Sequence, residues 1–244
     1  MTQGRIYNEA AAISAESVKK FYENRAKNQK GWNAVLLKDK RQSAADVNSR
    51  NAHEIALLAP HLPTPARVLD VGCGNGRWLA NLLQMNAIAH YDGIDFCAPF
   101  VADLKAQYAA DSRLHFYEMS ATALQKEKLL KEYDLIVTAC LSMYLNDDDM
   151  AQVYKNLGAL LSKNGVFYME ESVSTMGQRL TLADFYSEEL KTNYNAIYRT
   201  PEEYAALLKN EVGGELVAGS GTMLLTAETG AWEETNQAFW LLKR

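Results

Sequence analysis

Three glycines at alternate positions follow a short apolar segment of the sequence. Residues 68–71 read Val-Leu-Asp-Val. Gly72, Gly74 and Gly76 come directly after them, before an amphipathic stretch that begins at Arg77. Glycine lets the backbone approach a ligand closely and adopt torsion angles that other residues resist. A strand, a glycine-rich turn and a helix in this order indicate a site for a nucleoside-containing ligand.

A carboxylate follows at the distance along the chain that such a site requires. Asp95 ends the next apolar segment, 19 residues after Gly76, where it can accept hydrogen bonds from both hydroxyls of an adenosine ribose. Dinucleotide-binding proteins prefer GxGxxG, whereas this chain has GxGxG followed at once by Arg77. A cation there suits a ligand carboxylate. We therefore expect S-adenosylmethionine (SAM) rather than NAD.

The motifs resemble those of the class I SAM-dependent methyltransferases. Residues 68–78 resemble motif I and residues 91–96 resemble motif II, and the similarity continues through residues 133–137 and 160–165. It covers roughly residues 65–171 and a closing hairpin. The resemblance implies a Rossmann-like α/β fold, in which a mainly parallel seven-stranded sheet is closed by an antiparallel hairpin and covered by helices on both faces. It also implies SAM as cofactor and S-adenosylhomocysteine as product.

One position departs from the family's pattern. Many members carry an acidic residue after the third strand that contacts the adenine amino group, whereas this chain has Ser120 there. The resemblance places the methionine half of the cofactor against Gly72, Gly74 and Arg77, its ribose against Asp95, its adenine near Phe96, and Cys140 and Leu141 under it. Further cofactor-contact candidates are Asn75, Ser120, Ala121, Tyr22 and Arg25. The face that Tyr22 and Arg25 share in an N-terminal helical stretch is also a candidate for the lid and acceptor pocket.

Acceptor chemistry needs few protein groups, because the sulfonium donor is already activated. The protein mainly aligns the nucleophile and excludes water, and it needs a base only for a hydroxyl or ammonium acceptor. Glu170 and Glu171 close the fifth predicted strand at the ligand end, and Tyr144 lies in the loop after the fourth. These three are the catalytic or acceptor-orienting candidates. A plain capping role is the alternative for the two glutamates.

An aromatic-rich insertion precedes the last predicted helix. We expect residues 172–200 to be irregular and to form an acceptor lid, because loops beyond the carboxyl ends of the strands bind ligands in open α/β sheets. Packing of this aromatic patch onto the core alone is the alternative. The expected substrate contacts are Tyr186, Tyr194, Tyr198 and Arg199.

No metal site is predicted. The acidic run Asp147–Asp149 is better explained as the N-cap and first-turn acids of the next helix. The histidines follow no ligand spacing and are expected to be structural or exposed; they are His53, His61, His90 and His115.

Short apolar strands and amphipathic helices alternate from residue 67 onward, which is typical of a parallel sheet with helices on both faces. The predicted strands are 67–71, 90–95, 114–117, 135–139, 166–170, 215–219 and 237–242. The predicted helices are 14–27, 44–59, 77–86, 98–110, 121–131, 147–162 and one that begins at Thr200 with a capping box.

Length and composition fit one α/β domain of 244 residues. We expect residues 1–62 to form a helical cap and residues 63–244 to form the core with the lid insertion. Three scattered cysteines and the lack of an export signal favour the cytoplasm. No apolar run is long enough to span a membrane, and a net charge of −5 argues against a nucleic-acid partner. Nothing indicates the oligomeric state.

Two branches of the family resemble this chain beyond the cofactor motifs. Residues 185–190 and 194–200 resemble a feature of bacterial small-molecule methyltransferases from polysaccharide or natural-product pathways. Protein N-terminal α-amine methyltransferases share the GxGxGR turn. They carry Asp-Asn after the fifth strand, however, where this chain has residues 170–172, Glu-Glu-Ser. We therefore favour a small-molecule acceptor with an oxygen or nitrogen nucleophile. A peptide amine, or a non-catalytic SAM-binding accessory or sensor protein, is the alternative.

Overall fold

The computed structural model describes residues 4–28, 35, 44–225 and 233–244. Its helices are α1 (Ala15–Asn28), α2 (Ala44–Leu58), α3 (Arg77–Gln84), α4 (Ala98–Gln107), α5 (Asp147–Leu160) and α6 (Pro201–Leu207). Its strands are β1 (Gly4–Tyr7), β2 (Ala66–Val71), β3 (Ile88–Asp95), β4 (Leu114–Glu118), β5 (Tyr133–Ala139), β6 (Leu161–Ser174), β7 (Leu180–Ser187), β8 (Thr192–Tyr198), β9 (Glu215–Leu216) and β10 (Thr235–Lys243).

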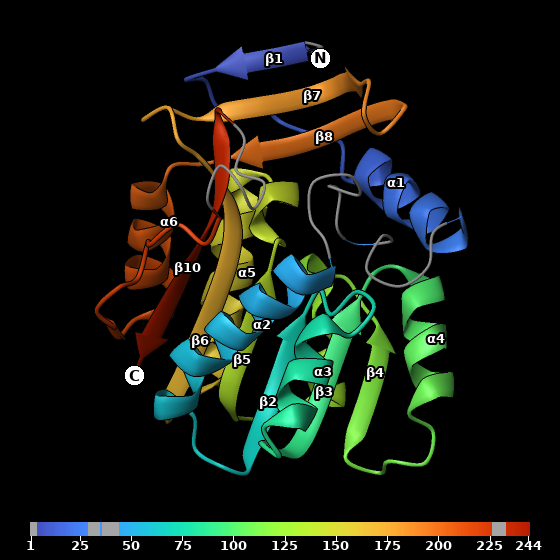
Figure 1. The fold of residues 1–244 in the computed structure, drawn as a ribbon, viewed down its shortest axis with the longest axis vertical. Coiled ribbons are helices and arrows are strands. Elements are labelled where there is room, and N and C mark those ends of the chain that lie inside the picture. Colours follow the sequence, from blue (N-terminus) through green and yellow to red (C-terminus); the bar gives the residue numbers. More distant parts are fainter. Residues whose placement is uncertain (1–3, 29–34, 36–43, 226–232) are drawn as a thin grey trace.

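The main sheet has seven strands in the order β4-β3-β2-β5-β6-β10-β9 (Figure 1). The five strands from β2 to β6 pair in parallel. β10 is antiparallel to both β6 and β9. This arrangement confirms the predicted Rossmann-like fold with its closing hairpin. The carboxyl ends of β2, β3, β5 and β6 meet at one edge of the sheet, where ligands bind in folds of this kind.

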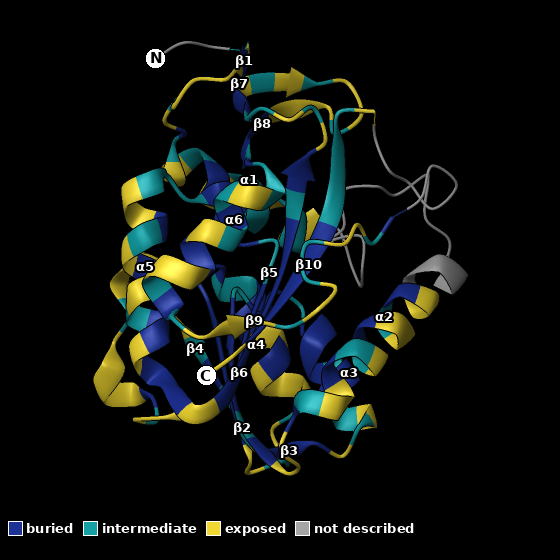
Figure 2. Ribbon diagram, turned by 90° about the vertical axis from the view of Figure 1, so that its left-hand side faces the viewer, coloured by how far each residue is buried: buried dark blue, intermediate teal, exposed yellow. Residues whose placement is uncertain are grey.

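Helices cover both faces of this sheet and form two separate cores. Side chains that alternate along the strands enter them in turn, so that Val68 packs with α2, α3 and α4 while Leu69 packs with α5 and α6. The same alternation places Tyr168 in the first core and Met169 in the second. The strands are therefore buried along most of their length (Figure 2).

A second, three-stranded antiparallel sheet lies beyond the carboxyl edge of the first, in the order β1-β7-β8 (Figure 1). It corrects two predictions. Residues 172–199 are largely extended rather than irregular, and residues 1–62 are not wholly helical. β7 and β8 pair with each other as a hairpin, and β1 joins them by pairing at long range, Gly4 to Tyr7 with Leu180 to Ala183.

One predicted helix is missing from the structure, and one predicted helix start is confirmed. The predicted helix 121–131 is absent, and two short 3-10 turns stand there, Ala121–Ala123 and Lys126–Lys128. At the first turn the Ser120 hydroxyl accepts the backbone N–H of Thr122, a local bond that competes with a continuous helix. The capping box predicted at Thr200 is confirmed, with Glu203 as its partner. Among the described residues, no helix has both the length and the apolar character needed to cross a membrane.

Candidate active site

The glycine turn after β2 and the carboxylate that ends β3 are bonded to one another. Gly72, Gly74 and Gly76 all have positive φ angles, of 77°, 53° and 85°. The Gly74 N–H donates to one oxygen of Asp95 at 2.9 Å, and the Cys97 N–H donates to the other at 2.8 Å. The Asp95 side chain is thereby held in one orientation.

The environment of Asp95 fits a ribose diol. Asp95 is 9% exposed. Burial raises the pKa of its carboxyl, and the two backbone N–H groups lower that pKa. Each carboxylate oxygen has two acceptor positions, so one on each remains for a ligand hydroxyl. A Cβ at Gly72 would lie 3.4 Å from Leu141, which shows how closely the turn and the loop after β5 approach each other.

Arg77 contacts side chains of α2 and β6 in the structure. Its guanidinium donates to Glu54 at 2.5 Å, to Asn51 at 3.2 Å and to Glu170. Burial raises the pKa of Glu54, while Arg77 and Arg50 hold the pKa of Glu170 low in spite of burial. Arg77 therefore ties α2 and α3 to β6, and its charge is balanced within the protein. The contact of Arg77 with the cofactor carboxylate stays a prediction, and the buried carboxylates of Glu54 and Glu170 occupy the same guanidinium.

The two glutamates proposed for catalysis do not face the acceptor side of the site. The Glu170 side chain forms a buried ion pair with Arg77. The Glu171 carboxylate accepts the backbone N–H groups of Leu141, Ser142 and Met143 at 2.9, 2.7 and 3.4 Å. It is fully buried and holds the loop after β5. The capping alternative describes Glu171 better than the catalytic one.

We expect Glu171→Gln to retain methyl transfer within about threefold, because an amide oxygen can still accept the two shorter bonds. Burial raises the pKa of Glu171 to about 7, so the folded state binds this proton more tightly than the unfolded state. The stability that this tighter proton binding adds to the folded state is present at low pH and is lost as the pH rises through about 7. Between about pH 6 and 8 the unfolding free energy should shift in favour of the glutamine variant by on the order of 1 kcal/mol.

Thermal unfolding at several pH values, with an activity assay at each, checks this expectation. Loss of methyl transfer in a Glu171→Gln variant that remains folded would restore the catalytic role.

Two buried tyrosines and the half-buried Tyr22 form a chain of hydroxyl groups. The Tyr22 hydroxyl donates to that of Tyr144 at 2.6 Å, and the Tyr144 and Tyr194 hydroxyls are 2.8 Å apart. Phe96 packs against Tyr22 with ring centroids 6.3 Å apart. Burial raises the pKa of all three phenols above the usual range. They are therefore neutral near pH 7 and act as hydrogen-bonding groups rather than phenolate bases.

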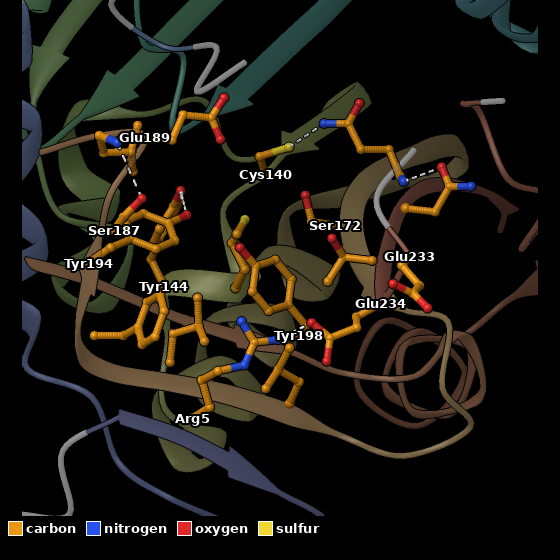
Figure 3. Close-up of a pocket in the computed structure, with 18 of the residues that line it drawn as sticks. Arg5, Cys140, Tyr144, Ser172, Ser187, Glu189, Tyr194, Tyr198, Glu233 and Glu234 are labelled. Carbon is orange, nitrogen blue, oxygen red and sulfur yellow. Dashed lines mark hydrogen bonds and ion pairs between the residues drawn. The ribbon is translucent and has the colours of Figure 1, made fainter. Parts of the chain in front are cut away.

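These tyrosines line a cavity of about 530 Å³ (Figure 3). Its floor is formed by the ends of β5, β6 and β10, and its other walls come from α1, α2 and the three-stranded sheet. An ion pair between Arg5 and Glu234 joins that sheet to β10. The polar and charged lining residues are Arg5, Tyr22, Arg50, Cys140, Tyr144, Ser172, Ser187, Glu188, Glu189, Tyr194, Tyr198, Glu233, Glu234, Thr235, Asn236 and Gln237.

Other predicted site residues lie in three kinds of place. Cys140 and Tyr198 line the cavity. Arg199 does not: it is fully buried and bonds Asp147 and the carbonyls of Ser142 and Leu145, because β8 turns into α6 there. Tyr186 is 51% exposed and stands outside the cavity. Ser120 accepts the Thr122 N–H, Ala121 is buried, Asn75 is half-buried, and Arg25 lies 5.7 Å from the Phe21 ring.

Sequence reasoning missed Arg50 and Glu54, which make up much of the buried charge beside the site. Their spacing of four residues places both on one face of α2. That spacing was the available signal. It carried no information on which face of the sheet the helix would cover.

Comparison with known proteins agrees with this geometry. Residues 69–167 match the family model described as a methyltransferase domain. A malonyl-[acyl-carrier protein] O-methyltransferase from Bacillus anthracis is 30% identical over 137 residues, which is 55% of this chain and 47% of that protein. The chain thus spans about half the length of this curated relative.

Two solved structures share the fold. Phosphoethanolamine N-methyltransferase 1 from Haemonchus contortus has a TM-score of 0.69 at 23% identity, covering 94% of this chain and 48% of that one. The 1,6-didemethyltoxoflavin-N1-methyltransferase of Burkholderia thailandensis has a TM-score of 0.67 at 17% identity, covering 98% and 94%. Residues 69–167 therefore carry a methyltransferase domain, on a fold that the chain shares with these solved methyltransferases.

Proposed function

We propose that this chain transfers the methyl group of SAM to an oxygen or nitrogen atom of a small molecule bound in the cavity. The observation that carries the proposal is the cavity itself. Its volume of about 530 Å³ is within the roughly 300–1,000 Å³ of small-molecule sites. It lies at the carboxyl ends of β5 and β6. Leu141, which follows the lining residue Cys140, is the residue that approaches Gly72.

The cofactor contacts are part of the proposal. Asp95 would accept the ribose hydroxyls, and Gly72 and Gly74 would allow the methionine half to lie against the backbone. The contacts predicted for Asn75, Phe96, Ser120, Ala121, Cys140 and Leu141 remain proposals of the same kind, as does that of Tyr22 from α1.

Bound SAM supplies an activated methyl group, so the chain's own residues have to orient the acceptor and exclude water. The hydroxyls of Tyr144 and Tyr194 point into the cavity (Figure 3) and are suited to orient the nucleophile. A hydroxyl or ammonium acceptor also needs a base. Among the described residues, the carboxylates that line the cavity are those of Glu188, Glu189, Glu233 and Glu234, and Arg5 pairs with the last of them.

The acceptor atom stays open between oxygen and nitrogen. The Bacillus relative is an O-methyltransferase, and the two structural neighbours are N-methyltransferases by name. The 1,6-didemethyltoxoflavin enzyme, which matches nearly the whole of both chains, is named for a small-molecule acceptor and supports one here.

The test uses methyl-deuterated SAM, the purified protein and a metabolite extract of the organism that encodes it, with mass spectrometry of both small molecules and peptides. Asp95→Ala serves as the control for cofactor-dependent labelling. A labelled small molecule supports the proposal. Label confined to peptides would replace it with a peptide-amine activity. SAM binding without any label would favour an accessory or sensor protein.

We expect Tyr144→Phe to lower methyl transfer about tenfold while leaving S-adenosylhomocysteine affinity within about twofold, because one hydrogen bond to the acceptor contributes on the order of 1 kcal/mol. Tyr108→Phe, at the far end of α4, is the matched control. Initial rates and calorimetry check the two quantities. An unchanged rate in Tyr144→Phe would remove the hydroxyl chain from the acceptor site.

A further inference from the structure

Arg50 on α2 has buried hydrogen-bond donors without a partner among the residues that the structure describes. The residue lines the cavity and is 7% exposed. Its Nη1 donates to the side-chain oxygen of Gln237 at 2.7 Å. Its Nε and Nη2 are buried without a hydrogen-bond partner. A buried, unsatisfied donor is costly, and more so on a charged group.

The two unpartnered nitrogens form the edge of the guanidinium whose N–H bonds run parallel. That edge matches the two oxygens of a carboxylate. Two other arginines of this chain use it in this way. Arg67 donates from Nε and Nη2 to Asp134 at 2.9 and 2.7 Å, and Arg113 donates from the same atoms to Asp111 at 2.9 and 2.6 Å.

The surrounding charges leave Arg50 available to a ligand. The two buried carboxyl groups of this region, Glu54 and Glu170, are both hydrogen-bonded to Arg77. The lining carboxylate of Glu234 pairs with Arg5. No carboxylate among the described residues forms an ion pair with Arg50. Arg50 acts on Glu170 and Glu54 only through space, so its Nε–Nη2 edge has no carboxylate in direct contact.

We propose that the Nε–Nη2 edge of Arg50 binds a carboxylate of a ligand in the cavity. The inference rests on the proposed function, in which the cavity ligands are the cofactor and its acceptor. The carboxylate has two possible sources, which are the amino-acid end of SAM and a carboxylate on the acceptor. In the first case Arg50 takes the role that the sequence assigned to Arg77. In the second it restricts the acceptor to an anionic small molecule.

The first arm of the test measures cofactor binding by calorimetry for the wild type, Arg50→Lys and Arg50→Met. Lysine keeps the charge but not the parallel donors, and methionine removes both. S-adenosylhomocysteine is compared with 5′-methylthioadenosine, which lacks the amino-acid carboxylate. If Arg50 binds the cofactor, both variants bind S-adenosylhomocysteine at least tenfold more weakly and methylthioadenosine as well as the wild type does.

The second arm measures transfer from deuterated SAM to metabolites that are retained on an anion-exchange resin. If Arg50 binds the acceptor, S-adenosylhomocysteine affinity stays within twofold in both variants, and Arg50→Lys forms the retained product at least tenfold more slowly. Arg113→Met, which removes a carboxylate-binding arginine remote from the cavity, controls for charge and should match the wild type. Unfolding temperatures verify that each variant is folded.

Unchanged S-adenosylhomocysteine affinity together with no slower formation of a retained product in Arg50→Lys overturns the inference. A failure of the proposed function looks different. In that case wild-type protein labels no small molecule at all, while the comparison of S-adenosylhomocysteine with methylthioadenosine still decides whether Arg50 holds the cofactor's carboxylate.

Discussion

Arg77→Leu is expected to lower the free energy of unfolding by about 3–5 kcal/mol, because it leaves buried carboxyl groups without their partner. Glu170 loses a guanidinium that holds its pKa low, and Glu54 loses its 2.5 Å hydrogen bond. For a chain of this length the loss corresponds to an unfolding temperature lower by roughly 6–20 °C. Thermal and urea unfolding measure it directly.

The double variant Arg77→Leu/Glu170→Leu is the matched control. It removes both members of one ion pair and leaves Glu54, whose pKa is already raised by burial and which can remain protonated. We expect the double variant to regain a large part of the lost stability. If the single variant instead unfolds within about 2 °C of the wild type but loses affinity for S-adenosylhomocysteine, Arg77 contacts the cofactor as the sequence first indicated.

Asp95→Ala is expected to weaken binding of SAM and S-adenosylhomocysteine by about 1.5–3 kcal/mol, or roughly 10- to 150-fold. The loss has two physical parts. The carboxylate can no longer accept ribose hydroxyls, and the N–H groups of Gly74 and Cys97 lose the acceptor that positions the turn. Titration calorimetry measures the change in affinity.

Asp103→Ala, which removes the same charge from an exposed position on α4, should bind both ligands as the wild type does. The affinity of Asp95→Asn for both ligands should lie between those of Asp95→Ala and Asp103→Ala, because asparagine retains one acceptor oxygen. Wild-type affinity in Asp95→Ala would show that the carboxylate does not contact the cofactor, and it would also remove the ground for using this variant as a labelling control.

The two variants divide the buried charges near the site into two groups. Asp95 is expected to act on the ligand with a smaller effect on stability. Arg77 is expected to act on stability first. A single assay of activity would not separate them, because an unstable protein and a protein that cannot bind SAM are both inactive.

Elements with local signals could be predicted from the order of the residues. The glycine turn with its positive φ angles, the apolar pattern of each strand segment and the capping box at Thr200 each depend on residues within a few positions of one another. Backbone sterics, apolar alternation and side-chain capping act over such distances. For that reason the fold class and the position of the Asp95 carboxylate at a strand end were predictable.

The distant groups that share the site are brought together by packing between elements. Glu54 approaches Arg77 because α2 packs against α3, and Tyr22 meets Tyr144 across 122 residues of sequence. β1 completes a sheet with β7, and Arg199 is drawn into the core by Asp147. Ion pairs, hydroxyl contacts and strand pairing are short-ranged in space and indifferent to separation along the chain. Residue type and spacing therefore could not show that Arg77 is neutralised and that Arg50 is left facing the cavity.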